Sequence, residues 1–194
     1  MRVAIVKYNA GNTASVANAL ARLGVEALIT NHPSELRSAD KIIFPGVGEA
    51  SSAMTYLRSM KLDETIRSLE QPVLGICLGM QLLCTSSEEN ETECLGLLPY
   101  RVQCFSAGKL KVPHMGWNQI RELDGPLFAG VASGSYVYFV HGFYVDNGDN
   151  STALCDYGPT FSAALSIRNF HAVQFHAEKS GAVGERILKN FLDL

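Results

Sequence analysis

The chain has 194 residues, of which 47% are hydrophobic, 16 are basic and 19 are acidic, giving a net charge of −3. This size favours a single domain over residues 1–194, and neither sign of charge forms the long run that attracts nucleic acid or anionic lipid. The N-terminal apolar run is too short for a signal peptide, and no stretch approaches the roughly 20 apolar residues of a membrane span. We therefore expect a cytoplasmic protein that binds neither nucleic acid nor membrane.

The first half alternates short β-branched runs with helical patterns. The pattern predicts strands at residues 3–6, 25–30, 42–44 and 73–76, a helix at 15–23 stopped by Gly24, and a helical stretch at about 50–69. A βαβ rhythm of this kind is typical of a mostly parallel central sheet with helices on both faces. The fold class is therefore α/β.

From about Tyr100 the sequence pattern changes to segments of alternating apolar and polar residues, separated by Gly, Asn and Asp turns. These segments predict an added, partly antiparallel β region in the C-terminal half, with strands at residues 101–105, 116–121, 136–140, 153–157 and 162–167. A last strand at 172–175 precedes a closing helix at 181–192. Residues 86–93 form a polar stretch that we interpret as a loop.

The cysteine pattern argues against both a disulfide framework and a metal site. Five cysteines are an odd count, and no two form a close C-x-x-C pair. We expect reduced thiols, no metal and no cofactor.

Cys77 has the setting of a nucleophile. In Gly75-Ile76-Cys77-Leu78-Gly79 it stands between glycines where a strand meets a helix, as the serine does in the G-x-S-x-G elbow of hydrolases. A helix that begins at Leu78 directs its free N–H groups toward the sulfur and favours the thiolate. An ordinary cysteine at a strand end is more often a buried structural residue. The flanking glycines make Cys77 the exception among the five.

His176-Ala177-Glu178 supplies a base and a carboxylate for that nucleophile. In an extended segment, residues two apart point to one face, so Glu178 can hold one imidazole nitrogen while the other faces the thiol. A structural histidine beside a solvated glutamate is the alternative interpretation of this pair. His114 and His141 are the competing histidines, since His32 precedes a proline in an expected surface turn.

A glycine segment, Pro45-Gly46-Val47-Gly48, follows one predicted strand as Cys77 follows the next. In a parallel sheet both then lie at the carboxyl edge, where ligand crevices form. Gly46 and Gly48 allow backbone N–H groups to approach an oxyanion, and the Leu78 N–H would complete the hole. A glycine pair after a strand is, by itself, more often a plain tight turn.

The two motifs around Cys77 and His176 resemble the class I, triad-type glutamine amidotransferases. Within that family, four segments resemble the glutaminase subunits of imidazole glycerol phosphate synthase: Pro45 to Gly48, Met80 after the elbow, His114-Met115-Gly116-Trp117-Asn118 and Tyr136 to His141. The resemblance covers essentially the whole chain. It leaves open a glutaminase subunit of another synthase, of the anthranilate or carbamoyl phosphate type, and a non-catalytic flavodoxin-like scaffold.

The resemblance implies a flavodoxin-like fold and hydrolysis of L-glutamine through a thioester on Cys77. The ammonia would pass to a (β/α)8-barrel cyclase subunit that makes imidazole glycerol phosphate in histidine biosynthesis. Gln81 and the Gly142-Phe143 segment would contact glutamine, and the residues implied to face the partner are Asn12, Trp117, Tyr138 and Lys179. Ala177 departs from the family by standing where proline is usual.

Overall fold

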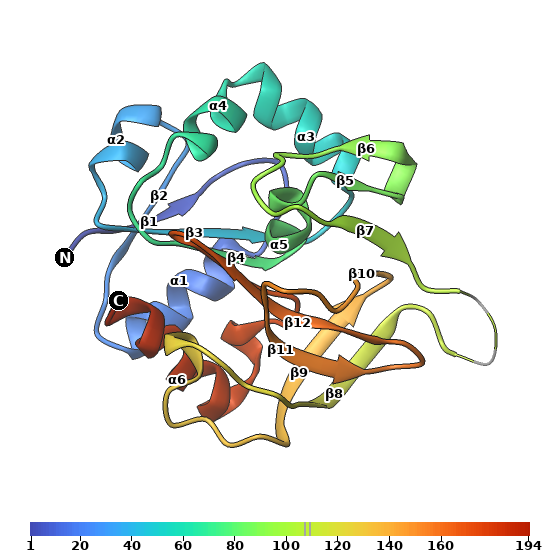
Figure 1. Cartoon of the computed structure of the whole chain (residues 1–194). Coiled ribbons are helices and arrows are strands. Elements are labelled where there is room, and N and C mark those ends of the chain that lie inside the picture. Colours follow the sequence, from blue (N-terminus) through green and yellow to red (C-terminus); the bar gives the residue numbers. More distant parts are fainter. Residues whose placement is uncertain (107, 109) are drawn as a thin grey trace.

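A seven-stranded sheet forms the centre of the computed structural model, which describes residues 1–106, 108 and 110–194. Its strand order is β11-β12-β13-β4-β3-β1-β2 (Figure 1). Five neighbouring strands are parallel: β1 (Val3–Val6), β2 (Ala27–Thr30), β3 (Lys41–Gly46), β4 (Val73–Cys77) and β13 (Phe170–Val173). The antiparallel strands β12 (Thr160–Ile167) and β11 (Ser151–Asp156) extend one edge. The predicted α/β fold class is confirmed.

Helices cover both faces of this sheet, as Figure 1 shows. On one face lie α2 (Pro33–Ser38), α3 (Ala50–Ser59) and α4 (Leu62–Arg67), and on the other lie α1 (Thr13–Arg22) and α6 (Gly181–Leu192). Each face has its own cluster of buried apolar side chains, with Leu57 and Ile66 in one and Leu20 and Ile187 in the other. This burial on both faces explains why the parallel strands are continuously apolar.

Three predicted segments differ in the structure. His32 and Pro33 do not form a simple surface turn, because Pro33 begins α2, where its missing N–H is not needed. The single helix expected over residues 50–69 is two, since Lys61 takes a left-handed conformation with φ 53°. The polar stretch at 86–93 is a short antiparallel pair, β5 (Ser86–Ser87) and β6 (Thr92–Glu93), joined by the 3₁₀ turn η1 (Glu89–Glu91).

The added β region forms two small sheets beside the central one. One has the order β10-β7-β5-β6 and includes β7 (Arg101–Cys104) and β10 (Phe143–Val145). The other is a two-stranded antiparallel ribbon of β8 (His114–Ile120) and β9 (Ser135–His141). Two more 3₁₀ turns are η2 (Pro126–Phe128) and η3 (Ala177–Lys179). Within the described residues, no helix has the length and apolar character needed to cross a bilayer.

Candidate active site

Cys77 stands in a sharp strand-to-helix turn at the carboxyl edge of the sheet. It ends β4, pairs in register with Gly46 at the end of β3, and precedes α5 (Leu78–Leu83). Its backbone has φ 53° and ψ −110°, a conformation that a non-glycine residue adopts only where the surrounding structure enforces it. The enforcement comes from tight packing, because a Cβ on Gly79 would overlap the carbonyl oxygen of Phe44. The glycine of the elbow thus lets α5 begin directly against β3.

His176 and Glu178 form a buried hydrogen-bonded pair. The His176 Nδ1 lies 2.8 Å from Oε1 of Glu178, and the same carboxylate oxygen accepts a hydrogen bond of 2.6 Å from Asn12. The extended segment assumed from the sequence is wrong, since Glu178 lies in η3. The contact forms nevertheless, because the tight 3₁₀ turn brings the carboxylate back to the imidazole. Nε2 of His176 is buried and has no hydrogen-bond partner among the described residues.

The electrostatics of this pair favour a charged imidazole. Burial by itself lowers the pKa of His176, but interactions with Cys77 and with Glu178 outweigh it and raise the pKa to about 9. Burial raises the pKa of Glu178, and the bonds to His176 and Asn12 more than offset that, so the net direction is downward. At neutral pH the arrangement is therefore an imidazolium held by a carboxylate beside the Cys77 sulfur.

A cavity of about 260 Å³ opens in front of the cysteine. Seven residues predicted from the sequence line it, together with four others: Val47, Gly48, Cys77, Leu78, Gln81, Gly142 and Phe143, then Glu89, Pro113, Val140 and His141. Gly46 does not line it. A Cβ on Gly46 would collide with the Tyr8 hydroxyl and with Leu78, so this glycine serves the close packing of β3 behind the cavity.

Gly48 differs from Gly46 in what it requires. Its φ is +116°, which L side chains rarely adopt, and open space surrounds the position where a Cβ would lie. Glycine is therefore needed here for conformation and not for lack of room. Val47 and Gly48 line the cavity together with Leu78, where a backbone N–H can meet a developing oxyanion.

The competing histidines are not available as bases. His141 Nδ1 donates to the Phe143 carbonyl at 2.7 Å, and its Nε2 lies 3.0 Å from Nδ1 of His114. Burial lowers the pKa of His141 to about 3 and that of His114 to about 4. With both ring nitrogens of His141 occupied and the ring neutral, His176 is the histidine that can exchange a proton at the cavity.

Glu89 is a charged residue of the cavity wall to which no sequence pattern pointed. It brings the one carboxylate among the described lining residues, and its Oε2 accepts a hydrogen bond of 2.7 Å from the Ala50 N–H at the start of α3. In the sequence it lies in a polar stretch with several acidic residues, and nothing local distinguishes it from Glu88 or Glu91.

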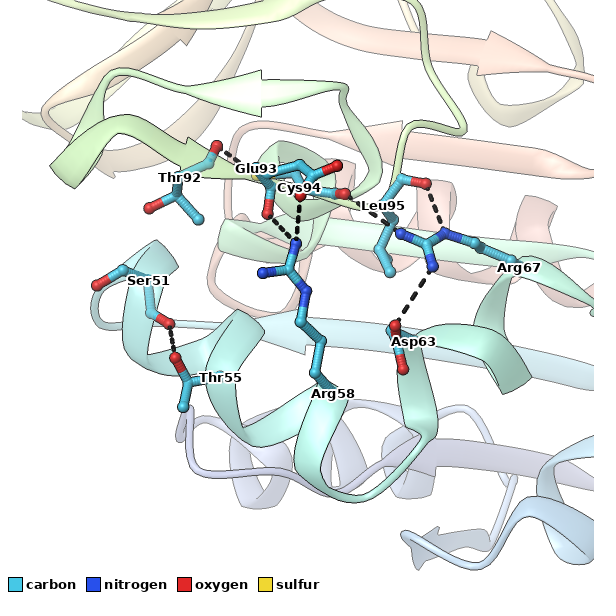
Figure 2. A network of polar contacts seen from close by, with 9 residues as sticks. All are labelled: Ser51, Thr55, Arg58, Asp63, Arg67, Thr92, Glu93, Cys94 and Leu95. Atoms are coloured by element: carbon cyan, nitrogen blue, oxygen red, sulfur yellow. Dashed lines mark hydrogen bonds and ion pairs between the residues drawn. The ribbon is translucent and has the colours of Figure 1, made fainter.

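Two arginines, one from α3 and one from α4, hydrogen-bond to the backbone at the C-terminal end of the hairpin that carries Glu89 (Figure 2). Arg58 of α3 donates to the Glu93 carbonyl at 3.0 Å and to its carboxylate at 3.1 Å. Arg67 of α4 donates to the Leu95 carbonyl at 2.9 Å. These contacts hold the C-terminal end of the hairpin against α3 and α4.

The predicted partner residues lie in two settings. Trp117 is 55% exposed and makes an edge contact with Tyr138 across the ribbon, while Lys179 is exposed on η3. Met115 and Tyr136 are also exposed on the outer face of the same ribbon, at 59% and 54%. Asn12 instead joins the buried acid–base pair through Glu178.

Comparisons with known proteins identify the family of the chain. The family described as glutamine amidotransferase class-I matches residues 4–194. The chain is 57% identical to imidazole glycerol phosphate synthase subunit HisH of Bacteroides thetaiotaomicron, with all of both chains covered, and 44% identical to that of Vibrio cholerae, with 99% and 98% covered. A crystal structure of a glutamine amidotransferase has a TM-score of 0.78 at 20% identity, covering 100% of this chain and 98% of that one.

Proposed function

The chain belongs to the class I glutamine amidotransferase family and, within it, to the HisH subunits of imidazole glycerol phosphate synthase, and we propose that Cys77, His176 and Glu178 are its catalytic residues. The observation that carries the proposal is their convergence. A strained nucleophile elbow, a buried His–Glu pair and a cavity that holds Cys77 meet at one edge of the sheet. The proposed reaction is hydrolysis of glutamine to glutamate and ammonia.

In the first step, the Cys77 sulfur attacks the amide carbon of glutamine. The carbonyl electrons move to oxygen, and the Leu78 N–H with a backbone N–H of the Val47-Gly48 segment stabilises that charge. The imidazolium of His176 gives its Nε2 proton to the amide nitrogen, the C–N bond breaks, and ammonia leaves. A glutamyl thioester and a neutral imidazole remain.

In the second step, neutral His176 takes a proton from water as the water oxygen attacks the thioester carbon. Collapse of the intermediate breaks the C–S bond and restores the sulfur anion and the imidazolium. The new γ-carboxyl group loses its remaining proton to water, and glutamate leaves. Glu178 fixes which imidazole nitrogen faces the reaction, since its carboxylate occupies Nδ1 at 2.8 Å. Asn12 holds that carboxylate at 2.6 Å.

Recognition of glutamine is assigned to Glu89 and Gln81. The Glu89 carboxylate supplies a negative charge suited to the α-ammonium group of an amino acid. Both N–H groups of Gln81 are engaged, by the Phe143 carbonyl at 3.1 Å and by Gln174 at 3.0 Å. Its Oε1 is then the atom that can accept from the substrate. The Phe143 carbonyl already accepts hydrogen bonds from Gln81 and His141. This segment therefore lines the cavity without offering that carbonyl to the substrate.

The partner we propose is the (β/α)8-barrel cyclase subunit, docked on the outer face of the β8–β9 ribbon. Exposed Met115, Trp117 and Tyr136 give that face an apolar centre, and Lys179 adds a charge at its border. The ribbon contacts the catalytic segment directly, because the His176 N–H donates to the Tyr138 carbonyl at 2.9 Å. Ammonia released at Cys77 would pass to the cyclase there. We place this assembly in the cytoplasm, in agreement with the five free thiols.

Glutamine turnover in three states tests the function and its coupling. The subunit alone should be slow, the subunit with the cyclase faster, and the subunit with the ligand-loaded cyclase fastest. The proposed gate is rotation of the peptide between Val47 and Gly48, and one oxyanion donor is worth roughly 10²- to 10³-fold in turnover. Gly48→Val should blunt the stimulation and leave cyclase binding intact, because the position has room for a side chain but an unsuitable φ. Equal rates in the three states would refute both coupling and gate.

A further inference from the structure

Gln174 is a fully buried amide that the reaction steps above do not use. It lies between the end of β13 and His176, with its backbone N–H bonded to the Ala163 carbonyl at 2.8 Å. Its side-chain Nε2 lies 3.7 Å from the sulfur of Cys77, within the longer range of hydrogen bonds to sulfur. Its Oε1 lies 3.0 Å from Nε2 of Gln81. The side chain therefore connects the nucleophile to a second buried amide.

The orientation of this amide follows from donor and acceptor roles. The Phe143 carbonyl can only accept, so Gln81, at 3.1 Å, must present its NH₂ group to it. The second N–H of that NH₂ group then donates to Gln174 at 3.0 Å, so Gln174 must accept with its side-chain oxygen. The NH₂ group of Gln174 is left facing Cys77. A backbone carbonyl thus determines, through two amides, that an N–H and not a lone pair faces the sulfur.

A histidine pair holds the same carbonyl from the other side. His141 donates Nδ1–H to the Phe143 oxygen at 2.7 Å, and its Nε2 accepts from His114 at 3.0 Å. Nε2 of His114 accepts in turn from Asn118 at 3.3 Å. Because the Phe143 carbonyl can only accept, it determines which atom donates and which accepts in each hydrogen bond of this chain. The Phe143 oxygen therefore receives two directed donors and cannot turn toward the cavity.

We propose that Gln174 donates an N–H to the Cys77 sulfur and thereby stabilises its thiolate, with Gln81 and the Phe143 carbonyl setting the direction of that donor. Besides His176, whose pKa the cysteine helps to raise, the sulfur has the Val140 carbonyl as a polar neighbour at 3.8 Å. A carbonyl can only accept and so suits the protonated thiol, whereas the Gln174 N–H suits the anion. The inference rests on the proposed role of Cys77 as nucleophile, and Gln174 acts on the reacting atom itself.

Gln174→Glu tests the proposal, because it keeps the shape and the acceptor but removes the N–H. The readout is the rate at which iodoacetamide alkylates Cys77, followed by peptide mass spectrometry without glutamine. The rate at pH 7 should fall about tenfold, the lower end for a hydrogen bond to a charged group, and the rate at pH 10 should match the wild type. Cys104, which is exposed, is the internal control and should react unchanged.

Gln81→Glu keeps the test decisive if Gln174→Glu does not fold. Two carboxylate oxygens at position 81 would attract the NH₂ group of Gln174, turn its oxygen to the sulfur and slow alkylation similarly. Gln119→Glu, an exposed change of the same chemistry, should have no effect. Wild-type alkylation at pH 7 in a folded Gln174→Glu or Gln81→Glu protein would overturn the proposal. Glutamine hydrolysis by Cys77→Ser would instead refute the nucleophile assignment, which separates the two failures.

Discussion

Replacing Glu89 with Gln tests the carboxylate that faces the cavity. Burial raises the pKa of Glu89, the Ala50 N–H lowers it and Glu49 raises it, and the net direction is upward. Part of the charge of this half-buried carboxylate is thus already stabilised by the N–H at the start of α3. A hydrogen bond to a charged group is worth about 1.5–3 kcal/mol, and the sharing argues for the lower value. About 1.5 kcal/mol corresponds to a roughly tenfold rise in KM for glutamine. Turnover at saturation should change little, since the α-ammonium group is remote from the reacting amide.

Glu88→Gln is the matched control for this change. Glu88 lies one residue earlier in the same hairpin, but its Oε2 accepts from the Cys104 N–H at 2.8 Å, and it pairs with Arg101 away from the cavity. The two variants lose the same charge. Glutamate release, measured over a range of glutamine concentrations with the ligand-loaded cyclase present, should separate them. Equal KM values would show that Glu89 does not contact the substrate.

Three further predictions concern the catalytic group and its support. Cys77→Ala should abolish glutamate release, and His176→Ala should nearly abolish it. Glu178→Gln should keep roughly 1–10% of turnover, because the imidazole loses one charged partner of several. Full activity of Cys77→Ala would refute the mechanism. The pKa of His176 is raised to about 9, so its contribution to stability is complete below about pH 6.5 and is lost as the pH rises through 9; urea unfolding between these values should show a steeper loss for the wild type than for His176→Ala. Gly79→Ala should lower the unfolding free energy by about 1–3 kcal/mol or more, since the Phe44 carbonyl cannot withdraw; an unchanged urea midpoint would contradict the packing of the elbow.

The sequence predicted the parts of the site that lie on regular elements. The strand before Cys77 is recognisable because it is apolar throughout, and the closing helix was predicted at the bounds that the structure shows, 181–192. Flanking glycines distinguish Cys77 because the tight turn requires small neighbours. The family resemblance then supplied roles for residues such as Gln81, which periodicity alone does not distinguish from other helical positions.

Long-range contacts could not be predicted from the sequence. Glu89 lies in a hairpin whose C-terminal end is held by two arginines of preceding helices, through the Glu93 and Leu95 carbonyls, and neither contact is visible in the sequence. The side chain of Gln174 contacts that of Gln81, which lies 93 residues earlier in the sequence. The His176–Glu178 contact was predicted correctly from an incorrect local geometry, since spacing of two brings side chains together in a 3₁₀ turn as well as in an extended segment with a suitable rotamer.

With the cyclase docked as proposed, neither face of the β8–β9 ribbon is free to vary. Its inward positions pack Val137 and Phe139 into the core, and its outward positions carry the exposed apolar side chains Met115, Trp117 and Tyr136. An ordinary surface strand tolerates substitution on alternate residues, and selection for folding alone should show that pattern here. Selection for growth without histidine should remove it, making both sets of positions intolerant. The difference between the two maps of mutational tolerance would outline the partner's footprint residue by residue.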